Sequence, residues 1–410
     1  MADPNWANRT IWTGDNLPIM RGMNSASVDL IYLDPPFNSN KTYSAPIGSE
    51  AAGAAFKDTW TLSDVDLAWH GEIAEQNPAV YAAIAAAGES HGPGMQSYLI
   101  MMAVRLLETH RLLKETGSLY LHCDPTASHY LKLLLDAVFG PQQFRNEIVW
   151  HYYNKYGVGK RVFGRNYDQI LFYSRTDRYV FTPQREPREK PVRQLQRVNV
   201  DGVLKNRRDA DGNLMYRTVT DRKVDAVWRI PAIQPASRHY MGYPTQKHDR
   251  VLSRIILASS RPGDLVLDPF AGCATTCVAA EHHERQWTGI DLSPLAAELV
   301  ERRLRDRART FARCIRRDDI PQRTDIGDLP AYRTHKHHLY GQQEGVCAGC
   351  RVFFPFRNLT VDHVIPQSQG GTHHLTNLQL LCGACNSLKG DRSQAYLLSV
   401  LRERGVLQAS

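Results

Sequence analysis

Residues 28–37 read VDLIYLDPPF, a largely apolar run that ends in an aspartate, two prolines and an aromatic ring. A short, nearly continuous apolar run is typical of a buried strand in a parallel sheet. A strand that only filled a core would not end in a carboxylate, two residues without an amide N–H and an exposed ring. The stretch therefore predicts a strand whose carboxyl end takes part in chemistry.

Three other segments have the same character: GSLYLHCDP (117–125), DLVLDPFAG (264–272) and RQWTGIDLS (285–293). Helical patterns lie between and around them, at residues 96–115, 127–139, 248–260 and 293–313. Strands that alternate with helices predict a doubly wound α/β sheet, whose ligands bind beyond the carboxyl ends of the strands. We therefore expect the chemistry at the edge marked by Asp34, Asp124, Asp268 and Asp291.

The chain of 410 residues is long enough for two or three domains, and its net charge is +8. A basic excess fits a polyanionic partner such as nucleic acid, and equally an ordinary basic protein. The alternation of strands and helices breaks over residues 141–243, which are rich in Arg, Lys, Tyr and Asn. Basic residues interleaved with aromatic ones suit phosphate contacts and base stacking, although a solvated subdomain has the same composition. We expect a first domain at 1–305, a charged linker at 306–340 and a cysteine-rich domain at 341–410.

A glycine turn is expected in LVLDPFAGCATT (265–276), between a strand and a helix. The N-terminus of such a helix favours the anionic end of a ligand, which small residues allow to approach the backbone. Asp291 closes the next strand about twenty residues later, the spacing of a carboxylate that holds a ribose diol.

These motifs resemble those of the amino-group DNA methyltransferases of the N6-adenine/N4-cytosine kind, over roughly residues 9–305. DPPF at 34–37 is similar to the family's (D/S/N)-P-P-(F/Y/W) tetrapeptide, and DPFAGCATT is similar to its loop for S-adenosylmethionine. The order of the motifs is that of the permuted beta class. The resemblance implies a Rossmann-like methyltransferase fold with residues 141–243 as an inserted target-recognition region. One departure is Ala274, which stands where the family has its second loop glycine and would tighten the turn.

The tetrapeptide suits transfer of a methyl group to an exocyclic amine, whose lone pair is delocalised into the ring. Acceptors for both N–H groups return the lone pair to the nitrogen; Asp34 supplies one acceptor and a proline carbonyl the other. Phe37 offers a face on which a flipped base stacks. The expected catalytic residues are Asp34, Pro35, Pro36 and Phe37. Aspartate at the head of the tetrapeptide favours N6 of adenine over N4 of cytosine.

The resemblance also implies a site for S-adenosylmethionine. Its expected residues are Asp15, Asn16, Lys247, Asp268, Phe270, Gly272, Thr275 and Asp291. The TGDNL segment, with Asp15 and Asn16, contacts the adenine of the cofactor in the family, and the PTQK segment (244–247), with Thr245, Gln246 and Lys247, lies beside the methionine end. An N-cap for Asp15 and a surface position for Lys247 are the alternatives. His122 and His129 are interpreted as structural.

Two C-x-x-C pairs stand near the end of the chain, CAGC (347–350) and CGAC (382–385). Four thiolates at this spacing predict a closed Zn²⁺ site made by Cys347, Cys350, Cys382 and Cys385. Residues 335–395 resemble the HNH nucleases, which have a ββα-metal core. The resemblance implies His363 as the general base that activates water, Asp362 and Asn386 as Mg²⁺ ligands, and Asn377 as the residue that holds the loop.

We therefore expect an enzyme that methylates double-stranded DNA, fused to an HNH domain that cleaves or nicks it. The alternatives are a tail that only binds DNA and a methyltransferase that acts on structured RNA. The N-terminus has no secretory signal and the most apolar helical stretch is interrupted by charges. The protein is expected to be cytoplasmic, of bacterial or phage origin, away from membranes, and a monomer or homodimer.

Overall fold

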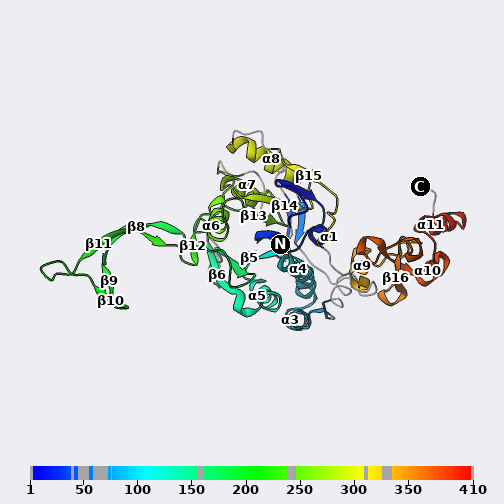
Figure 1. Ribbon diagram of the computed structural model, residues 1–410, viewed down its shortest axis with the longest axis horizontal. Helices are drawn as coiled ribbons and strands as arrows, with labels where there is room; N and C mark the ends of the chain where they lie inside the picture. Colours follow the sequence, from blue (N-terminus) through cyan, green and yellow to red (C-terminus); the bar gives the residue numbers. More distant parts are fainter. Residues whose placement is uncertain are drawn as a thin grey trace.

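The computed structural model describes residues 3–37, 41–44, 55–58, 73–74, 76–155, 161–237, 240, 246–308, 313–325 and 335–407. The main body is a nine-stranded sheet with the order β12-β6-β7-β5-β2-β13-β14-β1-β15 (Figure 1). Its strands are β1 (Thr10–Thr13), β2 (Val28–Leu33), β5 (Leu113–Cys123), β6 (Phe144–His151), β7 (Tyr167–Ser174), β12 (Val227–Arg229), β13 (Leu265–Asp268), β14 (Gln286–Asp291) and β15 (Ile315–Arg317). Strand β7 runs antiparallel to both neighbours, and the other neighbouring pairs are parallel. The predicted doubly wound α/β sheet is confirmed.

Helices cover both faces of this sheet, so its central strands β2, β13 and β14 are buried along nearly their whole length rather than at alternate residues. Leu30 and Tyr32 of β2 pack into one core with α6 (Asp249–Ser259), α7 (Thr275–His282) and α8 (Leu295–Ala308). Ile31 and Leu33 point the other way. They join a second core with α1 (Asn16–Gly22), α3 (Pro78–His91), α4 (Pro93–Leu112) and α5 (Ser128–Phe139).

The strand order reverses between β2 and β13, which are parallel neighbours. The next sheet strand after β2 in the chain is β5, on one side, whereas β13 continues to β14 on the other. Ligands of open α/β sheets bind at such a switch point, beyond the carboxyl ends of the strands. Asp34 directly follows β2 and Asp268 ends β13, so both lie at this point.

Residues 141–243 contribute more to the sheet than we expected, because β6, β7 and β12 are part of it. The segment that projects from the body is a two-stranded arm of β8 (Arg185–Leu195) and β11 (Tyr216–Lys223) (Figure 1). A second pair, β9 (Arg197–Val200) and β10 (Val203–Asn206), extends it. Nearly every side chain in these four strands is exposed. The arm therefore accounts for the basic, apolar-poor composition of residues 141–243. This composition concealed the buried strand β7 in the sequence.

The expected linker begins as part of the first domain. Strand β15 pairs with β1 at the edge of the sheet. Beyond it, the backbone N–H of Ser25 donates to Asp325 (2.8 Å) and that of Thr324 donates to Asn24 (2.8 Å). Residues 313–325 therefore lie along the surface of the first domain, and the part of the linker at 326–334 is outside the described residues.

The second domain is small. It contains α9 (Lys336–Gln342), the antiparallel pair β16 (Leu359–His363) and β17 (Leu378–Cys382), α10 (Gly383–Lys389) and α11 (Gln394–Glu403). Its core is a single cluster that includes Leu339, Leu380, Leu397 and three of the paired cysteines. A further antiparallel pair elsewhere in the chain is β3 (Lys41–Ser44) with β4 (Ala55–Asp58). Within the described ranges, no helix has the length and apolar character needed to cross a membrane.

Candidate active sites

Asp34 lies at the carboxyl end of β2, with its side chain 17% exposed. One carboxylate oxygen, Oδ2, is 2.7 Å from the ammonium nitrogen of Lys247. The other, Oδ1, is buried and accepts no hydrogen bond from any residue that the structure describes. A buried acceptor without a donor costs free energy. Oδ1 of Asp34 is therefore suited to accept a hydrogen bond from an N–H group of a ligand.

The rest of the tetrapeptide lies around this carboxylate. Pro35 is buried, and Pro36 and Phe37 are partly exposed. The Phe37 ring centre is 5.2 Å from the Lys247 ammonium and 5.6 Å from the centre of the His122 ring. Lys247 is therefore not a surface residue, because it is 9% exposed and paired with Asp34. Gln246 is described and half-buried, and Thr245 lies outside the described residues.

Next to Asp34, His122 is hydrogen-bonded to Tyr32 and Asp168, an arrangement that the sequence did not reveal. His122 is the penultimate residue of β5 and its ring is fully buried. Its Nδ1 is 3.7 Å from Asp34 Oδ1, beyond hydrogen-bond distance. The same Nδ1 is 2.8 Å from the hydroxyl of Tyr32, and Nε2 is 3.1 Å from Asp168. Burial alone would raise the pKa of Asp168, but hydrogen bonds from His122 and Tyr152 and nearby positive charge, including that of Lys247, together lower it. His122, which we interpreted as structural, therefore adjoins the carboxylate that is expected to be catalytic, a position that the sequence did not indicate.

The glycine turn after β13 surrounds Asp268, which is 3% exposed. Burial raises the pKa of Asp268 from 3.8 to about 7, although the backbone N–H of Phe270 donates to it at 3.1 Å. Ala274 adopts the left-handed conformation (φ 54°, ψ 35°) at the start of α7, just before Thr275. A glycine takes this conformation freely, whereas an alanine is strained there by roughly 1 kcal/mol. The departure at Ala274 therefore preserves the turn at some cost.

Asp291 and Asp15 are held in place by hydrogen bonds. Gly272 donates its N–H to Oδ2 of Asp291 (2.7 Å), and Ser293 donates to Oδ1 (2.8 Å). Each oxygen retains a second lone pair for a ligand. Asp15 caps α1 by accepting from Leu17 N–H, so the N-cap alternative is correct, and it also accepts from Arg105 (2.8 Å).

Asn16 links α1 to the turn after β13. Its amide donates to the carbonyl of Pro269 (2.7 Å) and accepts from Arg105 Nε (2.6 Å). The residues expected around the methyl donor therefore converge on the carboxyl edge of β1, β2, β13 and β14.

The cysteine cluster of the second domain can hold a metal ion. The four sulfur atoms of Cys347, Cys350, Cys382 and Cys385 all lie within 4.8 Å of one another. The sulfur of Cys347 accepts the backbone N–H of Cys382 (3.2 Å) and of Gly349 (3.4 Å). Four convergent thiols with amide donors are the usual shell of a structural metal site.

The residues that resemble a nuclease site lie on β16 and α10. Asp362 accepts from Lys389 (3.0 Å) and Gln379 (3.0 Å), and both contacts fall on Oδ2. Lys389 is 1% exposed and also donates to the carbonyl of His363 (2.7 Å). Asn386 is half-buried on the same short helix as Lys389. Lys389 and Gln379 thus both act on the same oxygen of Asp362, Oδ2.

His363 has a neighbour that the sequence did not suggest. Its Nε2 is 3.0 Å from Nδ1 of His373, so a second imidazole adjoins the expected general base. Burial, with the charge of His373, lowers the pKa of His363 from its ordinary value, which favours the neutral form that a base requires. Asn377 holds the intervening loop, because its amide donates to the carbonyls of Ile365 and Thr372.

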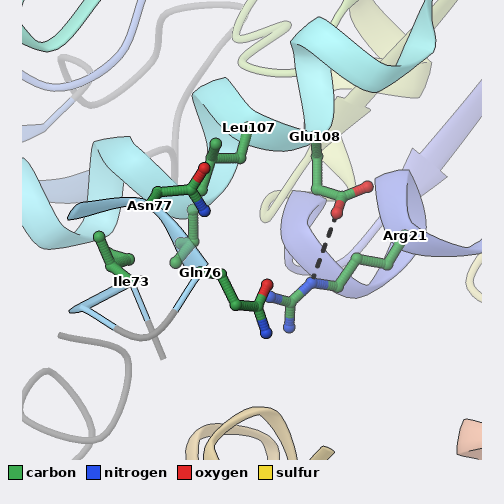
Figure 2. A pocket seen from close by; sticks show the side chains of 7 residues that line it. Arg21, Ile73, Gln76, Asn77, Leu107 and Glu108 are labelled. Atoms are coloured by element: carbon green, nitrogen blue, oxygen red, sulfur yellow. Dashed lines mark ion pairs between the residues drawn. The ribbon is translucent and has the colours of Figure 1, made fainter. Parts of the chain in front are cut away.

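A separate cleft lies beside α1 and α4 (Figure 2). Its lining includes Arg21, Asn77, Leu107 and Glu108, with Arg21 Nε 3.9 Å from the Glu108 carboxylate. None of the predicted site residues lines it. The predicted site residues of the first domain therefore lie apart from this cleft.

Comparisons with known proteins find matches to two separate parts of the chain. A family model described as DNA methylase matches residues 28–302, and one described as HNH endonuclease matches residues 347–392. The DNA adenine methyltransferase YhdJ of Escherichia coli is 28% identical over 305 residues, 72% of this chain and 82% of its own. The type II methyltransferase M.EcaI of Enterobacter cloacae is 26% identical over 348 residues, 72% of this chain and 69% of its own. The solved structure of an M1.HpyAVI–SAM complex has 16% identity and a TM-score of 0.41, covering 72% of this chain and 98% of that one.

Proposed function

Because this chain belongs to the N6/N4 DNA methylase family and has an HNH endonuclease domain at residues 347–392, we propose that it methylates the exocyclic amine of a base in double-stranded DNA, with S-adenosylmethionine as methyl donor. The observation that carries the proposal is the buried, unpartnered Oδ1 of Asp34 beside the partly exposed ring of Phe37. This oxygen can accept one N–H of a target amine while the base stacks on the ring.

The donor supplies an electrophilic methyl group on its sulfonium. Asp291 suits its ribose hydroxyls, since both carboxylate oxygens are fixed by backbone N–H groups and retain acceptor capacity. Asp15 and Asn16 lie across the same edge, where Arg105 holds both of them. With donor and base fixed by these groups, the displacement gains most of its rate from positioning.

We propose N6 of adenine as the target, because aspartate rather than serine heads the tetrapeptide. The test incubates the protein with tritiated S-adenosylmethionine and either unmethylated genomic DNA or structured RNA, then identifies the methylated nucleoside by mass spectrometry. N6-methyladenine in DNA is the expected product. N4-methylcytosine would overturn the choice of base, and label in RNA alone would favour the RNA alternative.

We propose that the arm of β8–β11 performs target recognition. At its base the cations are neutralised, since Arg185 pairs with Asp221 (2.6 Å) and Arg222 pairs with Glu186 (2.7 Å). Farther out, several exposed cations have no carboxylate partner among the described residues: Lys190, Arg193, Arg197, Lys205, Arg207 and Arg217. Cations left unpaired on a projecting ribbon suit the phosphates of a duplex.

We propose that the second domain is a nuclease held together by Zn²⁺ at its four cysteines. Asp362 and Asn386 would hold Mg²⁺, which stabilises charge that develops on the scissile phosphate, and His363 would deprotonate water. The test incubates supercoiled plasmid and Mg²⁺ with the wild type, His363→Ala and His373→Ala, and scores open-circle product. Nicking by the wild type but not by His363→Ala is expected. If no protein nicks methylated or unmethylated plasmid, the tail is a DNA-binding module.

A further inference from the structure

We propose that His122 and Asp168 form a relay that carries away the proton released from the methylated amine. The relay rests on the methyl transfer proposed above. Neither residue belongs to the tetrapeptide or to the donor site. His122 Nδ1 lies 3.7 Å from Asp34 Oδ1, and Asp168 is hydrogen-bonded to the other nitrogen of the same ring.

The hydrogen bond from His122 to Asp168 sets the tautomer of the ring. An ionised carboxylate only accepts, so the Nε2 atom, 3.1 Å from Asp168, carries the hydrogen. Tyr152 also donates to Asp168 (3.3 Å) and supports it from the other side. The basic Nδ1 of the ring therefore points towards Asp34 and the Tyr32 hydroxyl. A carboxylate that orients an imidazole towards a reacting group is the arrangement of a catalytic base.

The reaction produces a proton that must leave. When the amine nitrogen bonds to the methyl carbon, the carbon–sulfur bond breaks and its electron pair stays on sulfur. The nitrogen then carries a positive charge and one proton too many. Asp34 Oδ1 is the nearest acceptor, but a proton there would weaken the ion pair of Asp34 with Lys247. Transfer onward to His122 Nδ1 restores that ion pair and yields an imidazolium between two carboxylates.

The surroundings of His122 favour such a relay over direct loss to water. The ring has no exposed surface, and it lies against the rings of Phe37 and Trp150. Among the residues that the structure describes, the charged groups that face it are Asp34, Asp168 and, across Asp34, the ammonium of Lys247, and the titratable hydroxyl of Tyr32 contacts Nδ1. As the proton arrives on Nδ1, the hydroxyl of Tyr32 turns from donor to acceptor. The proton returns to solvent when the methylated base leaves the site.

The experiment compares wild type, His122→Ala, Asp168→Asn and the control His129→Ala, whose side chain is exposed on α5. Single-turnover methyl transfer to unmethylated genomic DNA is followed between pH 6 and pH 9, and donor binding by calorimetry. General acid–base catalysis contributes about 10²–10⁴-fold, so we expect at least a tenfold loss at pH 7 in the two relay variants, with donor affinity unchanged. Their rates should recover as pH rises, and that of His122→Ala also on addition of imidazole. His129→Ala should match the wild type.

The outcomes separate the relay from the function on which it rests. Wild-type rates in both relay variants would overturn the relay while methyl transfer stands. A slow His122→Ala that responds to neither pH nor imidazole would assign the ring a structural role and overturn the relay as well. If His122→Ala does not fold, Asp168→Asn, which preserves the shape of the side chain, decides alone. Absence of transfer by the wild type would overturn the proposed methyltransferase.

Discussion

Replacement of Asp268 by asparagine should stabilise the first domain, by an amount that grows with pH. The carboxyl has a pKa of about 7 in the folded protein because burial disfavours its charge, against an ordinary value of 3.8. Between these two pH values the folded state binds more protons than the unfolded one, so the free energy of unfolding falls as pH rises. Above pH 7, the ionisation of Asp268 lowers the free energy of unfolding by about 4 kcal/mol. Asparagine retains an acceptor for the N–H of Phe270 and carries no charge.

Thermal unfolding of wild type and Asp268→Asn at pH 4, 6 and 8 tests this reasoning. The two melting temperatures should nearly coincide at pH 4, and the variant should melt higher at pH 8, by on the order of 10 °C. Asp211→Asn, on the exposed arm, is the control and should follow the wild type at every pH. If the difference in melting temperature between the variant and the wild type is no larger at pH 8 than at pH 4, the argument is refuted. A carboxylate that destabilises its own fold is typical of a functional site.

Three further predictions concern the other groups. Asp291→Ala should weaken S-adenosylmethionine binding measured by calorimetry, because it removes the acceptor for the ribose hydroxyls; an unchanged dissociation constant would mean that the donor binds elsewhere. Replacing Arg207 and Arg208 on the arm with glutamine should reduce the slope of log affinity for DNA against log salt by about 0.9 for each phosphate that the variant no longer neutralises. Cys347→Ser, or chelation, should unfold the second domain, seen as protease sensitivity beyond residue 340, while methyl transfer persists, since so small a core depends on its metal.

The positions of the strands that carry the proposed site residues could be predicted from the sequence because local patterns specify them. In 28–37 and 264–272, a continuous apolar run followed by turn residues fixes both the strand and its carboxyl end. The C-x-x-C pairs are equally local, since the spacing itself places two thiols on one turn.

The relay residues could not be found in this way, because their contact depends on pairing between distant strands. His122 meets Asp168 only through the antiparallel register of β5 and β7, in which His122 lies opposite Ile170. No single segment records that register. The composition of residues 141–243 also gave no sign of this pairing, because the charged residues of the arm dominate the region that contains β7. His373 likewise reaches His363 only when the loop between β16 and β17 is folded.

The most direct test of the account measures methyl transfer and donor binding in Asp34→Ala and Asp34→Asn. Because we propose that Asp34 acts on the target amine and not on the donor, both variants should bind S-adenosylmethionine with nearly the affinity of the wild type. Transfer of tritiated methyl groups to unmethylated genomic DNA should fall below detection for Asp34→Ala. Wild-type levels of DNA methylation by Asp34→Ala would contradict the central claim, as would an equal loss of donor binding.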